Sequence, residues 1–142
     1  MDTQLDSKTL IRNGNYEPYN STYSSRVIYQ NSDTYLKIGY QSKSEARLFA
    51  KLPPEYKKYF AEIIQSGEIL HKRKTDFYVI QKRYEFPPEK QKFIHLYLYS
   101  NLVFTLRESY KLTDISIRDS GLSYNNCGIT DEGEFIIFDY GV

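Results

Sequence analysis

Residues 126–141 read Asn-Cys-Gly-Ile-Thr-Asp-Glu-Gly-Glu-Phe-Ile-Ile-Phe-Asp-Tyr-Gly, and this stretch decides how the rest of the chain is interpreted. The four apolar residues from Phe135 to Phe138 predict a buried strand, and they lead directly into Asp139. Asn126 lies thirteen positions before that aspartate. Taken alone, the polar residues between them also fit an ordinary turn of a β-hairpin. The spacing therefore has to be judged together with the elements that precede it.

The residues before this stretch predict an α+β fold in which most strands precede the longest helix. Alternating β-branched and aromatic residues predict strands, and apolar residues at helical spacing predict helices. The predicted strands cover residues 25–29, 34–40, 63–70, 76–83 and 133–138, and the predicted helices cover residues 42–52 and 88–110. Residues 1–18 are polar and contain Asn13-Gly14-Asn15 and Pro18 as breakers, so we expect a flexible N-terminal arm there.

The composition excludes several classes of protein. The chain has 142 residues, with 19 Lys and Arg, 18 Asp and Glu, and a formal net charge of +1. A charge so close to zero gives no attraction to nucleic acid or to an anionic membrane. The sequence also shows no apolar run long enough for a membrane span and no signal peptide. The single cysteine, Cys127, forms no internal disulfide, so we expect a cytoplasmic protein. From the charge and the short apolar runs, we expect neither a nucleic-acid nor a membrane partner.

The order of predicted elements, together with the spacing of Asn126 and Asp139, resembles the protein kinase-like family. That family places a metal-binding Asn thirteen residues before the Asp of its Asp-Phe-Gly motif, which is Asp-Tyr-Gly here. The resemblance implies one kinase-like domain over residues 19–142. Its small lobe, an antiparallel sheet plus one helix, would cover residues 19–86. A truncated large lobe would cover residues 87–142, since the sequence ends one residue after Asp139-Tyr140-Gly141.

The resemblance implies that the protein binds ATP and Mg²⁺. Phosphoryl transfer uses Mg²⁺ held by hard oxygen ligands, and a carboxylate and an amide oxygen suit it. Asp139 would supply the carboxylate and Asn126 the amide, with Asn125 as the alternative if the loop is displaced by one residue.

Lys37 resembles the strand lysine that holds the ATP phosphates, and Glu45 resembles the helix glutamate that orients it. An independent argument supports a partner for Glu45. This glutamate shares a helix face with Leu48, Phe49 and Leu52, where an unpaired charge would be costly. Lys37 is the candidate partner, and we expect the pair within about 4 Å. In the alternative interpretation, Ser42 and Glu45 form a capping box and Glu45 only caps the helix.

The predicted catalytic loop departs from the family. Asp119, in Ile117-Arg118-Asp119, resembles the aspartate of His-Arg-Asp that accepts the proton of the substrate hydroxyl. It precedes Asn126 by seven residues, whereas the family has five. Asp114 is a second candidate for the base. Both aspartates also fit solvated loop residues without a catalytic role.

The glycine-rich loop of the family is absent, because Asn20, Thr22 and Ser25 occupy the positions of its three glycines. Hydroxyl groups still donate hydrogen bonds to phosphates, so nucleotide binding remains an expectation. The resemblance assigns cofactor binding to a set of five residues. These are Lys37, Ser25, Val27, Ile80 and Lys82, and adenine would meet the backbone of residues 80–84.

Three functions from different classes follow. The first is an atypical minimal kinase, of viral or bacterial-effector type, that transfers phosphate from ATP or mimics a kinase. The second is a pseudokinase-like interaction module, and the third is an unrelated α+β binding domain. The predicted helix 88–110 is apolar on several faces, so we expect it to bind a host protein or a second copy of the chain. Such effectors act in the host cytoplasm.

Overall fold

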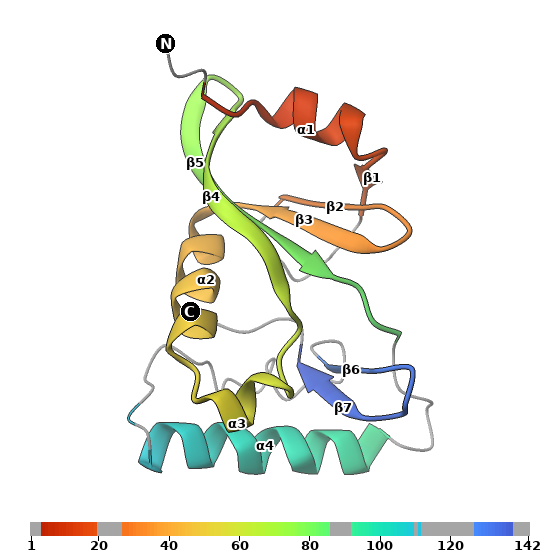
Figure 1. The fold of residues 1–142 in the computed structure, drawn as a ribbon, viewed down its shortest axis with the longest axis vertical. Coiled ribbons are helices and arrows are strands. Elements are labelled where there is room, and N and C mark those ends of the chain that lie inside the picture. Colours follow the sequence, from red (N-terminus) through yellow and green to blue (C-terminus); the bar gives the residue numbers. More distant parts are fainter. Residues whose placement is uncertain (1–3, 20–26, 86–91, 110, 112–126, 138–142) are drawn as a thin grey trace. The chain divides into compact units, whose positions relative to one another are not determined.

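The computed structural model describes residues 4–19, 27–85, 92–109, 111 and 127–137 (Figure 1). The predicted α+β class is confirmed, because the described residues form one antiparallel sheet, several helices and a separate hairpin. The chain divides into two compact units. The first contains Met1–Arg47 and Glu62–Arg83, and the second contains Leu48–Ala61 and Tyr84–Val142.

A five-stranded antiparallel sheet forms the centre of the first unit, counted over the described residues. Its spatial order is β1 (Glu17–Pro18), β2 (Val27–Gln30), β3 (Thr34–Ile38), β5 (Lys74–Lys82) and β4 (Ile63–His71). The long β4–β5 hairpin is visible in Figure 1. The predicted strands at residues 25–29, 34–40, 63–70 and 76–83 are confirmed within the described ranges, with ends shifted by one or two residues.

A side chain defines one hairpin turn of this sheet, and backbone geometry defines the other. Between β2 and β3, the Asn31 side-chain oxygen accepts hydrogen bonds from the Asp33 and Thr34 amides at 3.0 and 2.8 Å. Between β4 and β5, Lys72 and Arg73 both have positive φ, at 49° and 67°. Two successive residues with positive φ are what a tight two-residue hairpin turn requires.

One face of the sheet carries the apolar core of the first unit. Its buried side chains are Leu36, Ile38, Ile69, Tyr78 and Ile80. Partly buried residues from outside the central strands pack against them, namely Leu5, Leu10, Ile11, Tyr16 and Tyr29. Cross-strand neighbours share a face and adjacent residues alternate. Lys37 therefore lies on the other face.

The N-terminal segment differs from the expected flexible arm. Residues Ser7–Asn13 form helix α1, and Glu17–Pro18 form β1 beside β2. Asp6 caps the helix by accepting a hydrogen bond from the Lys8 amide at 2.7 Å. The Leu70 amide donates to the Leu5 carbonyl at 2.7 Å, which joins this segment to β4. Two apolar helix residues, Leu10 and Ile11, pack against the core cluster and hold this segment on the sheet. The helix breakers Asn13-Gly14-Asn15 and Pro18 had suggested a flexible arm instead.

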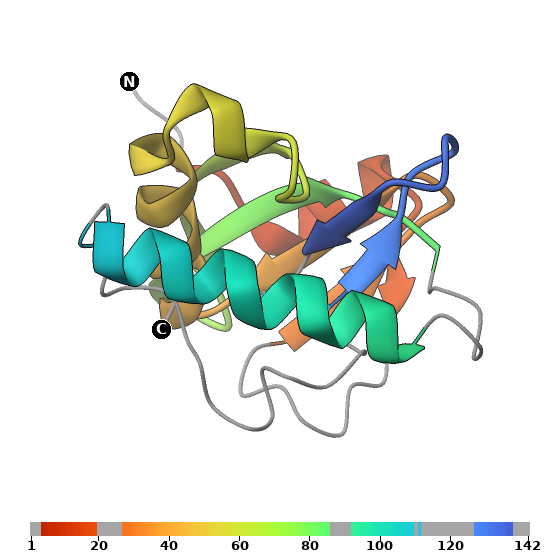
Figure 2. The same ribbon diagram turned by 90° about the horizontal axis from the view of Figure 1, so that it is seen from below.

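The second unit contains the longest helix and a small hairpin. Its elements are α3 (Pro54–Lys57), α4 (Lys92–Ser109), β6 (Cys127–Ile129) and β7 (Phe135–Ile137) (Figure 2). Helix α2 (Tyr40–Lys51) begins in the first unit and ends in the second. The predicted helix 88–110 is confirmed over its described residues. The predicted strand 133–138 is confirmed over Phe135–Ile137, whereas residues 133 and 134 are exposed and lie before β7. Strand β6 is an addition, since this short Gly-containing segment was expected to be a loop.

Backbone hydrogen bonds connect the residues after α3 to β7. The Ala61 amide donates to the Ile137 carbonyl, and the Ile137 amide donates to the Tyr59 carbonyl, both at 2.7 Å. The buried apolar side chains of this unit come from α2 and the residue after it, the residues after α3, α4 and β7. They are Leu48, Leu52, Phe60, Ala61, Leu106, Ile136 and Ile137.

Candidate functional site

Lys37 reaches its position because β3 has a fixed register with both of its neighbours. Opposite it lie Ile28 on β2 and Val79 on β5. Its own neighbours, Leu36 and Ile38, belong to the apolar core on the other face. Lys37 is only 3% exposed. An ammonium group with so little water contact needs an anionic partner.

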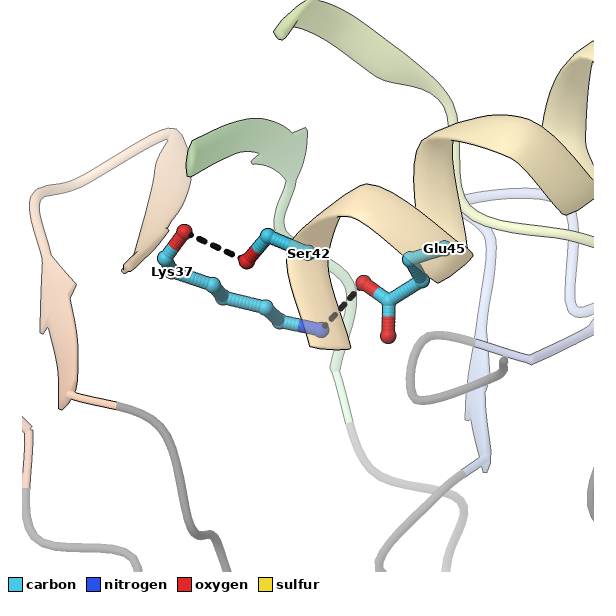
Figure 3. A network of polar contacts seen from close by, with 3 residues as sticks. All are labelled: Lys37, Ser42 and Glu45. Atoms are coloured by element: carbon cyan, nitrogen blue, oxygen red, sulfur yellow. Dashed lines mark hydrogen bonds and ion pairs between the residues drawn. The ribbon is translucent and has the colours of Figure 1, made fainter. Parts of the chain in front are cut away.

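Glu45 on α2 is that partner. The Lys37 Nζ lies 3.4 Å from the Glu45 Oε1, and the glutamate is fully buried (Figure 3). The predicted pairing within about 4 Å is confirmed. In water such a pair contributes little, but in a buried site each charge depends on the other for compensation.

A single glycine brings the strand and the helix together. β3 ends at Ile38 and α2 begins at Tyr40, so only Gly39 separates them. Gly39 has a φ of 151°, in the region that favours glycine, and its amide donates to the Phe77 carbonyl at 2.8 Å. This direct connection explains why eight residues are enough to bring Glu45 beside Lys37.

Ser42 fixes the first turn of α2 against β3. Its Oγ donates a hydrogen bond to the Lys37 main-chain carbonyl at 2.8 Å (Figure 3). Because α2 begins at Tyr40, Ser42 lies inside the helix and not at its N-cap. The capping-box interpretation, which needs Ser42 at that position, does not hold. Ser42 instead positions the helix that carries Glu45.

The register separates some predicted cofactor-binding residues from Lys37. Val27 pairs with Ile38, and Ile80 pairs with Leu36, so both side chains lie on the apolar-core face. Lys82 has the same parity as Ile80 on β5 and shares that face. Lys37 occupies the face that carries the ion pair, and the side chains of Val27, Ile80 and Lys82 do not.

The other predicted site residues lie outside the described residues. They are Ser25 of the cofactor set, Asp119 and its alternative Asp114, Asn126 and its alternative Asn125, and Asp139. Their roles remain predictions. Within the part of the chain that the structure describes, no three His, Cys, Asp or Glu residues gather as a metal site would require.

Gln81 is a site candidate that the sequence interpretation missed. It pairs with Tyr35 across β3 and β5, two residues from Val79, and so lies on the face of Lys37. It is fully buried. The sequence signal was weak, because Phe77-Tyr78-Val79-Ile80 is an unbroken apolar run and shows no alternation that would assign Gln81 to a face. Parity alone would also not reveal whether a carboxamide has partners.

Tyr35 adds an ionisable group to the same face. Burial is the main reason that the pKa of Tyr35 is raised above its usual value, and the nearby Tyr19 raises it further. Arg83 lowers it in part, with its guanidinium 5.3 Å from the centre of the Tyr35 ring. Together, Tyr35, Lys37 and Gln81 place three polar groups on this face, beside the apolar Ile28 and Val79.

The second unit has a cavity of its own. Its volume is about 540 Å³. Its walls come from α3, Tyr59 shortly after α3, α4 and the β6–β7 turn. The lining residues are Tyr56, Tyr59, Leu98, Asn101, Leu102, Thr105, Gly133 and Glu134. On α4, Tyr97, Leu98 and Phe104 are 68%, 42% and 64% exposed. This helix therefore presents large apolar side chains next to a concave surface.

Comparison with known proteins adds no relative: no protein-family model and no curated protein matches the chain. The resemblance to protein kinases therefore rests on the residues of this chain alone. Among the described helices, none has the length and apolar character needed to cross a membrane.

Proposed function

We propose that the protein is an atypical kinase-like protein that binds ATP and Mg²⁺ and acts by phosphotransfer or as a kinase mimic. The buried ion pair between Lys37 and Glu45 is the observation that carries this proposal. A buried pair of opposite charges is a weak source of net stability, because desolvation cancels much of the attraction. We therefore attribute the buried ion pair of Lys37 and Glu45 to a functional role and not to stabilisation of the sheet.

Phosphate binding supplies that reason. A lysine side chain held at its tip by a carboxylate is fixed in direction before a ligand arrives, which reduces the entropy lost on binding. Glu45 is positioned in turn by the bond from Ser42 to the carbonyl of Lys37. In this proposal Lys37 binds the phosphates, and Glu45 is a positioning residue.

The remaining roles follow the resemblance. Asn126 and Asp139 hold Mg²⁺, which neutralises charge on the phosphates. Asp119 accepts the proton of the substrate hydroxyl. At the same time the hydroxyl oxygen bonds to the γ-phosphorus of ATP and ADP leaves. All three residues lie outside the described ranges, and an assay of phosphate transfer from ATP tests their roles directly.

Thermal unfolding with and without ATP and Mg²⁺ tests the binding step. A ligand at one hundred times its dissociation constant stabilises the folded state by about 2.7 kcal/mol, so the wild type should melt at a higher temperature. The double variant Lys37→Met/Glu45→Leu removes both charges together and should fold but lose the shift. Lys74→Met, at an exposed lysine of β5, is the matched control and should keep it.

Two further variants test the metal ligands. Asn126→Ala and Asp139→Ala should each abolish the Mg²⁺-dependent part of the shift. An equal shift in wild type and in the double variant would refute the site at Lys37, and unchanged ATP affinity in both metal variants would refute the Mg²⁺ ligands.

A second candidate function is a pseudokinase-like interaction module that uses α4. The exposed side chains of Tyr97 and Phe104 favour it, because they lie seven residues apart and so share one helix face. Light scattering should detect association with a second copy or with a host protein. Tyr97→Asp should weaken that association, whereas Tyr97→Phe, which keeps the ring, should not. A monomer at high concentration that binds no host protein would refute this candidate.

A further inference from the structure

The side chain of Gln81 occupies a defined place beside the ion pair. β3 and β5 pair so that Val79 lies opposite Lys37 and Gln81 lies opposite Tyr35. Cross-strand partners share a face, and so do residues two apart on one strand. Gln81 therefore lies on the face of Lys37, two residues beyond Val79 toward the end of β5. Its side chain has no exposed surface.

The carboxamide of Gln81 lacks hydrogen-bond partners. Neither its Nε2 nor its Oε1 is bonded to any residue in the part of the chain that the structure describes. Leaving a buried donor or acceptor unpaired costs about 1–3 kcal/mol, and most buried side-chain polar groups in proteins have a partner. The charges of Lys37 and Glu45 on the same face do have one. The missing partners of Gln81 are therefore expected to come from outside the described residues, and a bound ligand can supply them.

The main chain next to Gln81 is already engaged. The Lys82 amide donates to the Glu62 carbonyl at 3.0 Å, and the Arg83 amide donates to the Asp33 carbonyl at 2.9 Å. These two donors are unavailable to a ligand while the sheet keeps this register. At this end of β5, the side chain of Gln81 offers both an open donor and an open acceptor.

We propose that the Gln81 carboxamide binds the base of the nucleotide whose phosphates Lys37 holds. The inference rests on the proposed function and names the group that recognises the base. A carboxamide presents a donor and an acceptor side by side, which matches the amino group and adjacent ring nitrogen of adenine. Two residues along a strand span roughly 7 Å. A ligand that contacts both positions therefore needs a hydrogen-bonding base at one end and an anionic group at the other.

Three probes separate recognition of the base from binding of the phosphates. They are ATP, purine riboside triphosphate, which lacks the amino group of adenine, and inorganic tripolyphosphate, each with Mg²⁺. The wild type should bind ATP about tenfold or more tightly than purine riboside triphosphate, as expected when a hydrogen bond to the base is lost. In Gln81→Met the two nucleotides should bind equally, and the affinity for tripolyphosphate should stay at the wild-type level.

A matched control and a ligand-free measurement complete the test. Gln30→Met changes a half-buried carboxamide that lies opposite Tyr35 from β2, and it should keep the wild-type preference for ATP. Without ligand, Gln81→Met should melt at a higher temperature than the wild type, because the unpaired groups are gone. A variant that binds ATP less well and yet is more stable distinguishes recognition from simple loss of structure.

The outcomes distinguish this inference from the function on which it rests. If no probe binds the wild type, the proposed function fails and the inference fails with it. If ATP binding depends on Lys37 but Gln81→Met keeps the preference for ATP, only the role of Gln81 is overturned. A buried water molecule bonded to Gln81 in place of a base would give that second result.

Discussion

Leu36 and Lys37 are adjacent on β3, yet their side chains lie on opposite faces of the sheet and are stabilised in different ways. Leu36 packs into a cluster of apolar side chains, to which α1 and the segment before it add Leu5 and Leu10. Lys37 pairs with Glu45 on a face that also carries Tyr35 and Gln81. On the apolar face, the buried side chains pack against one another and against α1 and the segment before it. On the other face, Gln81 has no hydrogen-bond partner among the described residues, which a bound ligand would supply.

The largest expected effect is the loss of one member of the ion pair. Glu45→Ala removes the carboxylate that pairs with the buried Lys37 ammonium, so the free energy of unfolding should fall by about 3–5 kcal/mol. The double variant Lys37→Met/Glu45→Leu removes both charges and should recover most of that loss. Urea denaturation, with the slope compared between variants, measures both changes.

A small effect of Glu45→Ala would change the interpretation of this face. A loss below about 1 kcal/mol is typical of pairs that water screens. The polar face would then be open to solvent, and the argument that a ligand must complete it would lose its basis.

The second prediction concerns the apolar face. Leu36→Ala leaves a cavity in a cluster where Leu36 has no exposed surface, so the free energy of unfolding should fall by about 2–5 kcal/mol. Ile64→Ala, at a residue of β4 that is 55% exposed, is the control and should stay within about 0.5 kcal/mol of the wild type. Neither variant should change the relative affinity for ATP and tripolyphosphate. A change in Leu36→Ala would mean that the two faces are coupled.

Local patterns were enough to predict most of the sheet and two helices. β-branched and aromatic residues identified the strands, and the position of Glu45 on an apolar helix face predicted its pairing with Lys37. Helix α1 was missed because Asn13-Gly14-Asn15 and Pro18 suggested an irregular arm. The Asp6 cap and the apolar pair Leu10 and Ile11 were the signals that could have identified it.

The site was less predictable than the fold because it depends on which strand positions face each other. Counting along the chain placed Val27 and the backbone of residues 80–84 near the nucleotide, and the register of β2, β3 and β5 adds that the side chains of Val27 and Ile80 lie on the face opposite to Lys37. Gln81 shows the complementary difficulty. Its face follows from the register of β3 and β5, and the absence of hydrogen-bond partners among the described residues depends on neighbours distant along the chain.

The smallest expected effect concerns the dependence of stability on pH at Tyr35. Burial, followed by the charge that Tyr19 would carry, raises the pKa of Tyr35 above the usual 10.0. The folded state therefore keeps this proton at a pH where the unfolded state releases it. The stability that it contributes is fully present below the usual tyrosine pKa, and it is lost as pH rises through the raised folded pKa.

The test compares wild type and Tyr35→Phe in urea at several pH values from about 8 to 11. Ionisation of lysines and of tyrosines distant from Tyr35 contributes to both proteins and cancels in the difference between their free energies of unfolding, whereas the effect of Tyr19 on Tyr35 is part of that difference. Loss of the hydrogen bond between Tyr35 and Arg83 adds an offset that should not vary until the arginine itself titrates. The difference should change only above the usual tyrosine pKa, in favour of Tyr35→Phe, with a slope below the roughly 1.4 kcal/mol per pH unit of a whole proton. If the difference is constant over this range, Tyr35 titrates as an exposed tyrosine does, and the polar face near Gln81 is wetter than its burial indicates.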